Sequence, residues 1–393
     1  PALVLLGNLA LDSYVFRDAR SFAESAIARD PRSAAAQQLL AQVLAGSDDA
    51  AGAIAAANAA RRLDPKGQVF TLAETLVQLD RIEEARIELE RLLQDDDAGP
   101  QAERRRAVRA YREGDVQEAA GRFSQRLRTG DDPAEALFYL GALAERHGNE
   151  QAALDMYSRL VQAGAGLMAR RRAAAVLMKQ GQRAEAFAML DAEEAGKPGV
   201  AVDIVLAKAA LLLENGAPAD ALPLLDAALE RFPAHPGLEY QRALTLESAG
   251  RVQDSIAAFD ALYRKRPEDP GLMNALGYTL ADHSRNLSRA SRLIDSALER
   301  TPDNPAILDS LGWTRYRQGN AEQALAPLAR AYRLSRDTEI AAHWGDVLWS
   351  LGREGEARTV WARALARDPD SRLLKTTIER HIPAPLQSPT PPK

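Results

Sequence analysis

Residues 303–332 read DNPAILDSLGWTRYRQGNAEQALAPLARAY, and the spacing of small residues within them decides the fold. Gly312 and Ala324 fall where two helices would have to cross closely, because neither carries a side chain large enough to hold the backbones apart. Gly319 lies between them, and glycine accepts the left-handed backbone that separates one helix from the next. Pro302 comes just before, where a preceding helix must stop. The stretch therefore predicts one pair of antiparallel helices.

The same pattern recurs along the chain at a period of 33 to 35 residues. Repeats begin near residues 1, 34, 66, 100, 134, 167, 202, 236, 270, 305 and 338. The eighth position of each is small: Gly7, Ala41, Ala73, Ala107, Gly141, Ala174, Ala209, Ala243, Gly277, Gly312 and Gly345. The twentieth position is Ala19, Ala53, Ala85, Ala119, Ala153, Ala186, Ala221, Ser255, Ala290, Ala324 and Ala357. Keeping Ala290 in register requires a one-residue insertion around Asn286.

Turn and stop signals keep the same phase. Glycine occupies the turn between the two helices at Gly114, Gly148, Gly181, Gly216, Gly250, Gly319 and Gly352. Proline follows the second helix at Pro31, Pro65, Pro198, Pro233, Pro267, Pro302 and Pro369. The repeats that end near Asp97, Asp131 and Ala165 lack this proline, so the N-terminal half is the more degenerate.

Small residue, glycine turn, alanine and proline in this phase resemble the tetratricopeptide repeat (TPR) family. The resemblance implies an all-α solenoid of about eleven helix-turn-helix repeats, wound as a right-handed superhelix over residues 1–371. Residues 372–382 should form a helix that caps the open end, as solenoids require. Residues 383–393 are rich in proline and should form a disordered tail.

Composition excludes several classes of protein. A net charge of −5 argues against a general nucleic-acid binder, which needs a surplus of Lys and Arg. The absence of cysteine excludes disulfides and thiolate chemistry. The apolar runs, Leu3 to Leu6 and Ala201 to Leu213, are too short or too charged to span a bilayer.

No residue pattern indicates catalysis. The histidines are scattered, at His147, His235, His283, His343 and His381, without paired metal spacing. Glu339 and His343 share a helix face, but such a pair is more often a surface contact than a metal site. Gly164, Gly166 and Ala169 loosely match a dinucleotide loop, yet no strand precedes them. We therefore expect no catalytic residue, no metal and no cofactor, and a protein that is not an enzyme.

The TPR resemblance implies that the first helix of each pair lines a concave protein-binding groove, at positions five, nine, twelve and thirteen of each repeat. The C-terminal candidates are Asn274, Tyr278, Asp282, Asp309, Trp313, Tyr316, Arg317, Asp346 and Trp349. Aromatic rings supply contact area, while Asn and Asp can hydrogen-bond a peptide backbone. For Trp344 and Trp361 we expect core positions instead, and for Trp313 and Trp349 groove and core both stay open.

Two basic helices lie upstream. The first carries Arg104, Arg105, Arg106, Arg109 and Arg112, and the second carries Arg170, Arg171, Arg172 and Lys179. They form a possible basic patch for an acidic partner segment. The alternative, which general experience favours, is a solvated surface paired with acids such as Asp95 to Asp97.

The C-terminal third suggests a narrower family. Residues 276–302, LGYTLADHSRNLSRASRLIDSALERTP, continue through 303–332 into EIAAHWGDVLWSLGREGEARTVWARALARDPD at 339–370. This resembles a group of proteobacterial TPR lipoproteins of the outer membrane. The best-known pseudomonad member of that group binds a periplasmic carboxyl-terminal processing protease, a serine protease, and delivers cell-wall (peptidoglycan) hydrolases to it.

That resemblance implies a periplasmic adaptor for proteolysis with two kinds of protein partner, the protease and its hydrolase substrates. It also implies attachment to the outer membrane through a lipid anchor whose signal and lipobox cysteine are not in this chain. The generic repeat pattern leaves an alternative open, a scaffold for envelope polysaccharide export or outer-membrane assembly. No nucleic acid is expected as a partner.

Overall fold

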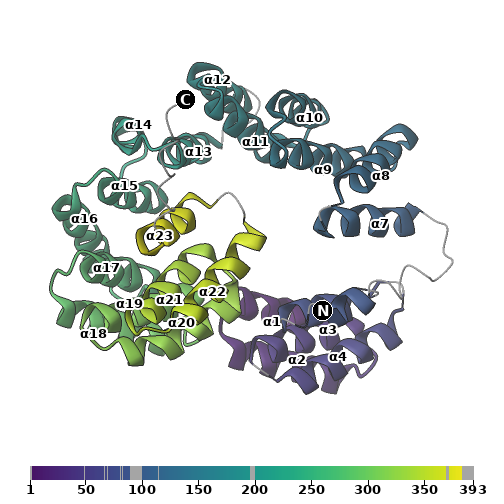
Figure 1. The fold of residues 1–393 in the computed structure, drawn as a ribbon, viewed down its shortest axis with the longest axis horizontal. Helices are drawn as coiled ribbons and strands as arrows, with labels where there is room; N and C mark the ends of the chain where they lie inside the picture. The colour runs from purple at the N-terminus through teal and green to yellow at the C-terminus, as the bar shows by residue number, and fades with distance from the viewer. Residues whose placement is uncertain are drawn as a thin grey trace, which may run out of the picture. The chain divides into compact units, whose positions relative to one another are not determined.

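The computed structural model describes residues 2–47, 49–65, 67–68, 70–79, 81, 83–88, 100–113, 115–194, 200–368 and 371–382. All regular elements in these ranges are helices, which confirms the predicted all-α class and the TPR solenoid arrangement of helix pairs (Figure 1). The chain forms two compact units, unit 1 of residues 1–89 and 259–393, and unit 2 of residues 90–258. The predicted tail at 383–393, Gly114, Pro198, Pro369 and Asp95 to Asp97 lie outside the described residues.

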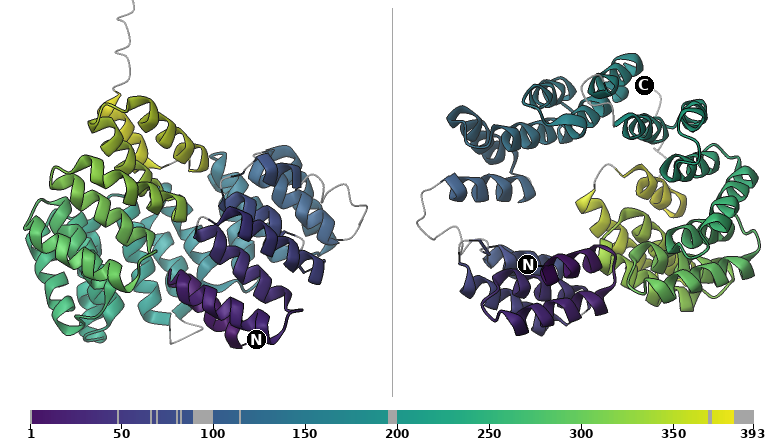
Figure 2. Two further views of the ribbon diagram at one scale, coloured as in Figure 1. Left: turned by 90° about the horizontal axis from the view of Figure 1, so that it is seen from below. Right: turned by 180° about the vertical axis from the view of Figure 1, so that it is seen from behind.

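Unit 1 contains the two ends of the chain. Its helices are α1 (Ala2–Asp12), α2 (Phe16–Arg29), α3 (Ala34–Gly46), α4 (Ala50–Leu63), α5 (Thr71–Gln78), α17 (Pro270–Asp282), α18 (Leu287–Arg300), α19 (Pro305–Arg317), α20 (Ala321–Ser335), α21 (Thr338–Ser350), α22 (Glu354–Arg367) and α23 (Arg372–His381). Residues 83–88 are also helical. Consecutive helices pack side by side, as two further views show (Figure 2).

Unit 2 contains the middle repeats. Its helices are α7 (Pro100–Glu113), α8 (Val116–Thr129), α9 (Pro133–Arg146), α10 (Glu150–Gln162), α11 (Gly166–Lys179), α12 (Arg183–Glu194), α13 (Ala201–Glu214), α14 (Pro218–Arg231) and α15 (Pro236–Ser248). Helix α16 (Val252–Lys265) runs through the boundary between the units. Apolar residues of α11 to α15 form one continuous core cluster, as expected when each pair buries surface on its neighbours.

The turn signals act as the sequence predicts. Gly148, Gly181, Gly216, Gly250, Gly319 and Gly352 take positive φ angles between 68° and 87°. A residue with a Cβ would be disfavoured there, so glycine ends the first helix and lets the second turn back. The inserted residue near Asn286 is accommodated in the same way, because Ser284 and Asn286 both take positive φ.

The helix crossings are as close as the small residues require. The alanines at the twentieth position and Ser255 are all buried. Ser255 Oγ satisfies its polarity by donating to the backbone oxygen of Ala243, 2.8 Å away. At the eighth position, a Cβ added to Gly345 would overlap the indole ring of Trp361 at Nε1. Glycine is therefore required at that crossing by the ring that packs over it.

Helix ends follow the prolines and the capping residues. Helices α14, α16 and α18 end two residues before Pro233, Pro267 and Pro302. Asp269 caps α17 and Asn304 caps α19, because each side-chain oxygen accepts from backbone N–H groups of the first turn. Helix α23 occupies the segment expected to close the stack. Within the ranges that the structure describes, no helix has the length and apolar character needed to cross a membrane.

Candidate protein-binding surface

The predicted groove residues of α17 and α19 are joined by hydrogen bonds between successive first helices. Trp313 Nε1 donates to Asp282 Oδ1 at 2.9 Å, and the Trp313 ring is only 8% exposed. Arg317 donates to the same carboxylate oxygen at 3.4 Å and to Ser284 Oγ at 2.7 Å. Asp282 therefore accepts from two side chains of the following repeat.

The next step connects α19 to α21 through His343. Its Nδ1 lies 3.0 Å from both carboxylate oxygens of Asp309, and its ring stacks on Trp313 with 4.2 Å between centroids. Burial by itself lowers the pKa of His343, but the charge and hydrogen bond of Asp309 outweigh it and raise the pKa above the usual 6.5. Asp309 therefore favours the charged form of the imidazole.

Tyr278 reaches from α17 to α21. Its hydroxyl donates to Glu339 Oε1 at 3.2 Å. Burial raises the pKa of Glu339, with the opposing pull of nearby His343 being smaller. Burial and the neighbouring carboxylates raise the pKa of Tyr278 far above its ordinary value, so the phenol stays protonated and keeps donating. We call Tyr278, Asp282, Asp309, Trp313, Glu339 and His343 the first-helix ladder.

A second cluster closes the end of the stack around Asp346. His381 Nε2 lies 2.8 Å from Asp346 Oδ1, and Arg380 Nη1 donates to Oδ2 at 3.3 Å. Trp349 contacts Trp361 and His381, with ring centroids 5.7 Å and 5.2 Å away. The carboxylate of Asp346 and the ring of Trp349 therefore both help to hold α23 against α21.

These positions settle where the tryptophans lie. Trp361 is 1% exposed and belongs to the core, as predicted. Trp344 is half-buried and packs against the same core. Trp313 is buried, while Trp349 is half-buried under α23. The binding role predicted for Trp313 and Trp349 stays a prediction, now limited to the exposed fraction of each ring.

Asn274 and Tyr316 complete the predicted groove set. Tyr316 is half-buried and contacts Trp313, with 5.3 Å between ring centroids. Asn274 lies one turn before Tyr278 on α17, and its Oδ1 is buried with no hydrogen-bond partner among the residues that the structure describes. A buried amide oxygen without a donor is costly, so Asn274 is the one predicted groove residue whose bonding is incomplete in the described chain.

The two basic helices are largely neutralised by acids of the same or the neighbouring repeat. Arg104 pairs with Glu135 at 2.7 Å, Lys179 with Glu145 at 3.0 Å, and Arg170 with Glu193 at 2.8 Å. Arg106 pairs with Glu103, Arg109 also has a partner, and Arg105 is half-buried. The side chain of Arg112 lies outside the described residues. Arg171 differs, because it is exposed and has no ion pair with any residue described.

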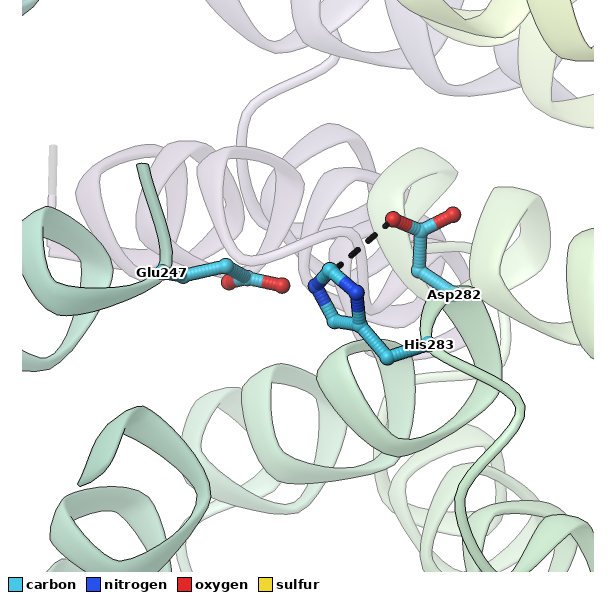
Figure 3. Close-up of side chains that lie close together, drawn as sticks. All are labelled: Glu247, Asp282 and His283. Atoms are coloured by element: carbon cyan, nitrogen blue, oxygen red, sulfur yellow. Dashed lines mark ion pairs between the residues drawn. The ribbon is translucent and has the colours of Figure 1, made fainter. Parts of the chain in front are cut away.

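The ladder residues that sequence analysis did not select for binding are Glu339 and His343, and His381 of the cluster around Asp346 was not selected either. Glu339 and His343 do share a helix face, but each points to a different repeat rather than to a shared metal. The sequence did contain a signal for His343, because it is a histidine that lies between apolar residues inside a first helix. Figure 3 shows His283 beside Asp282, 3.9 Å apart; Glu247, drawn with them, belongs to unit 2.

Comparison with known proteins agrees with the repeat assignment. A family model for the tetratricopeptide repeat matches residues 4–67, 104–167, 206–270, 240–286 and 274–337. The TPR repeat-containing protein PA4667 of Pseudomonas aeruginosa is 33% identical over 211 residues, which is 54% of this chain and 36% of that protein. This chain thus spans about a third of the length of the curated relative that it matches.

Matches among solved structures include two repeat proteins. Yeast Tom70 is 14% identical with a TM-score of 0.46, and the match covers 97% of this chain and 95% of Tom70. The TPR protein TTC0263 of Thermus thermophilus is 23% identical with a TM-score of 0.42, covering 45% of this chain and 97% of TTC0263.

Proposed function

This chain belongs to the tetratricopeptide repeat family, and from that premise we propose that it is a non-enzymatic adaptor of the LbcA type. TPR domains are scaffolds for protein–protein interaction. In the proposal, one surface binds a periplasmic carboxyl-terminal processing protease and another presents cell-wall hydrolases to it. The protein would act in the periplasm, attached to the outer membrane by a lipid. Support comes from the C-terminal resemblance and from the match to a pseudomonad TPR protein.

The observation that carries protein binding is the unpartnered amide oxygen of Asn274, which has no donor among the described residues. It lies on a first helix, beside a ladder of side chains that are already satisfied by one another. Because this oxygen is itself covered, the half-buried Asn274 side chain would have to turn for an extended partner to donate a backbone N–H to Oδ1 and remove the cost of leaving it unpaired. Tyr278, one turn farther along α17, and Trp313 and His343 of the following repeats are fixed by their own contacts.

The adaptor role is tested by reconstitution. The full-length gene product, the protease and a cell-wall hydrolase are mixed, and hydrolase cleavage is followed with and without the adaptor. We expect cleavage to accelerate at least tenfold and a complex of adaptor and protease to appear by size-exclusion chromatography. Absence of both the complex and the acceleration would refute the proposal.

Asn274→Ala separates binding from folding. We expect partner binding to weaken about tenfold, while the free energy of unfolding stays equal or rises, because the variant removes an unsatisfied buried group. Binding is measured by titration calorimetry and stability by urea denaturation.

The matched control is Asn149→Ala. Asn149 Oδ1 caps α10 by accepting from Ala152 N at 3.1 Å, so its loss should cost about 1 kcal/mol of stability and leave binding unchanged. If Asn274→Ala instead destabilises the protein and binds its partner normally, Asn274 is a structural residue.

A further inference from the structure

A pocket in unit 2 lies between three consecutive first helices, α9, α11 and α13. Its volume is about 540 Å³, within the range that binding pockets occupy. Small side chains, Ala175, Ala207 and Ala210, leave the space open. The pocket is remote in sequence from the first-helix ladder and shares no residue with it.

The walls of this pocket combine apolar and charged groups. Phe138 and Met168 line the apolar side, and Met168 is 52% exposed. Arg171 and Arg172 follow on α11, one helical turn from Met168, and Glu214 lies at the end of α13. A ligand that fills the pocket would therefore meet an apolar surface and a pair of guanidinium groups together.

The charges around the pocket leave a positive excess on its α11 side. Arg171 is exposed and has no ion pair within the described chain. Arg172 lies 3.8 Å from Glu145, but Lys179 already pairs with that carboxylate at 3.0 Å. The Arg172 guanidinium also stands 5.9 Å from the Phe138 ring, which keeps it over the apolar wall.

We propose that this pocket binds an extended protein segment in which a large apolar side chain lies next to a carboxylate. The apolar side chain would fill the space above Ala175 and Ala210 and contact Phe138 and Met168. The carboxylate would accept bidentate hydrogen bonds from Arg171, as guanidinium geometry favours. Glu214, on the opposite wall, can accept a backbone N–H of the segment.

The inference rests on the proposed protein-binding function and adds a second surface with its own chemistry. It identifies the recognised feature as an acidic, apolar motif. It also gives Arg171 a role that separates it from the other residues of the basic patch, whose charges are largely met inside the chain.

Fluorescence anisotropy with labelled peptides tests this directly, without the protease. The probes are GSGELDGSG, the basic analogue GSGKLKGSG and the analogue without an apolar side chain, GSGEGDGSG. We expect the first to bind the complete protein at least tenfold more tightly than the other two, and more weakly as salt rises.

Two variants test the location. Ala210→Phe fills the pocket and Arg171→Glu reverses its exposed charge; each should weaken GSGELDGSG binding tenfold or more. Arg128→Glu, an exposed arginine on α8 outside the pocket, should change affinity less than twofold. Circular dichroism checks folding, and should Ala210→Phe fail to fold, Arg171→Glu on the surface decides alone.

Equal binding of all three peptides, preference for the basic peptide, or full affinity in Arg171→Glu would overturn the proposal. None of these results would affect the adaptor role, since hydrolase cleavage is measured separately. Conversely, the peptide result stands whether or not the protease is a partner.

Discussion

At the scale of single residues, the stacked pair of Trp313 and His343 with Asp309 shows how polar groups are used between repeats. His343 is 9% exposed and Asp309 6% exposed, so the charges are largely removed from water. A buried charge pair of this kind is costly to break, because the remaining partner would be left without compensation.

The ladder makes stability depend on pH. The pKa of His343 is raised in the folded protein, so its contribution is fully present below about pH 6.5 and is lost as pH rises through the folded-state value. The raised pKa of Glu339 acts in the same direction, beginning lower, from its ordinary 4.5. We expect the free energy of unfolding to fall as pH rises above about 6.5, by roughly 2 kcal/mol for His343, which lies within the range for a hydrogen bond to a charged group.

His343→Gln should remove the part of this decline that His343 contributes above pH 6.5. The part from Glu339 should remain and move to higher pH, because the charge of His343 lowers the pKa of Glu339. Urea denaturation at a series of pH values measures it. His147→Gln, at the exposed end of α9, is the control for exchanging histidine for glutamine. A His343→Gln profile that overlays the parent profile would show that the pair does not contribute.

Gly345 provides a prediction in which two similar substitutions have opposite effects. Gly345→Ala should destabilise the protein by about 1–3 kcal/mol, because its Cβ would overlap Trp361, which is 1% exposed. Gly121→Ala, inside α8 with nothing within 4 Å of the added Cβ, should stabilise it by about 0.5–1 kcal/mol. Chemical denaturation compares them, and equal signs would contradict the crossing geometry.

The sequence alone was enough to predict the residues whose role depends only on the local backbone. The turn glycines and the crossing alanines were predictable because φ angles and helix proximity restrict residue type at fixed positions. It could not decide whether Trp313 was buried, since burial depends on His343, which lies one repeat later. The pairing of Arg104 with Glu135 could not be predicted either. The sequence indicated that acids would neutralise the basic helices, but not that Glu135 of the following repeat would do so.

At the scale of elements, α23 has the clearest separate role. Within the described chain, α23 is not paired with a second helix in a repeat of its own. It packs against α21 and α22 through Leu374, which is fully buried, and through His381. The sequence predicted this helix from the need to cover an open end, but not the contact of His381 with Asp346.

Adjacent leucines test this docking. Leu374→Ala should cost about 2–5 kcal/mol, as for other buried leucines, while Leu373→Ala, 48% exposed, should cost less than about 1 kcal/mol. Thermal and urea unfolding of the two variants measure the difference. Similar losses for both would mean that α23 is not docked as described.

At the scale of the whole molecule, contacts are made mainly between neighbouring helices, so stability should be a sum of local terms. This property was predictable from the repeat period. The division into two units could not be predicted, because every repeat has the same pattern of small and apolar residues where it contacts the next one.

Hydrogen exchange should show this locality. Leu225→Ala, which removes a fully buried side chain of α14, should raise amide exchange in α11 to α15 and leave α19 to α22 unchanged. Leu374→Ala should give the reverse pattern. Uniform acceleration in both variants would instead indicate that the chain unfolds as one cooperative body.

The close crossing of Gly345 under Trp361 also bears on how such a sequence changes over time. A larger residue at one site is tolerated only with a smaller one at the other, so substitutions there should be inherited in pairs. The same constraint applies where Gly141 meets Tyr157. Among descendants of a common ancestor, the two residues of each crossing should therefore change together, and largely independently of the residues at crossings in other repeats.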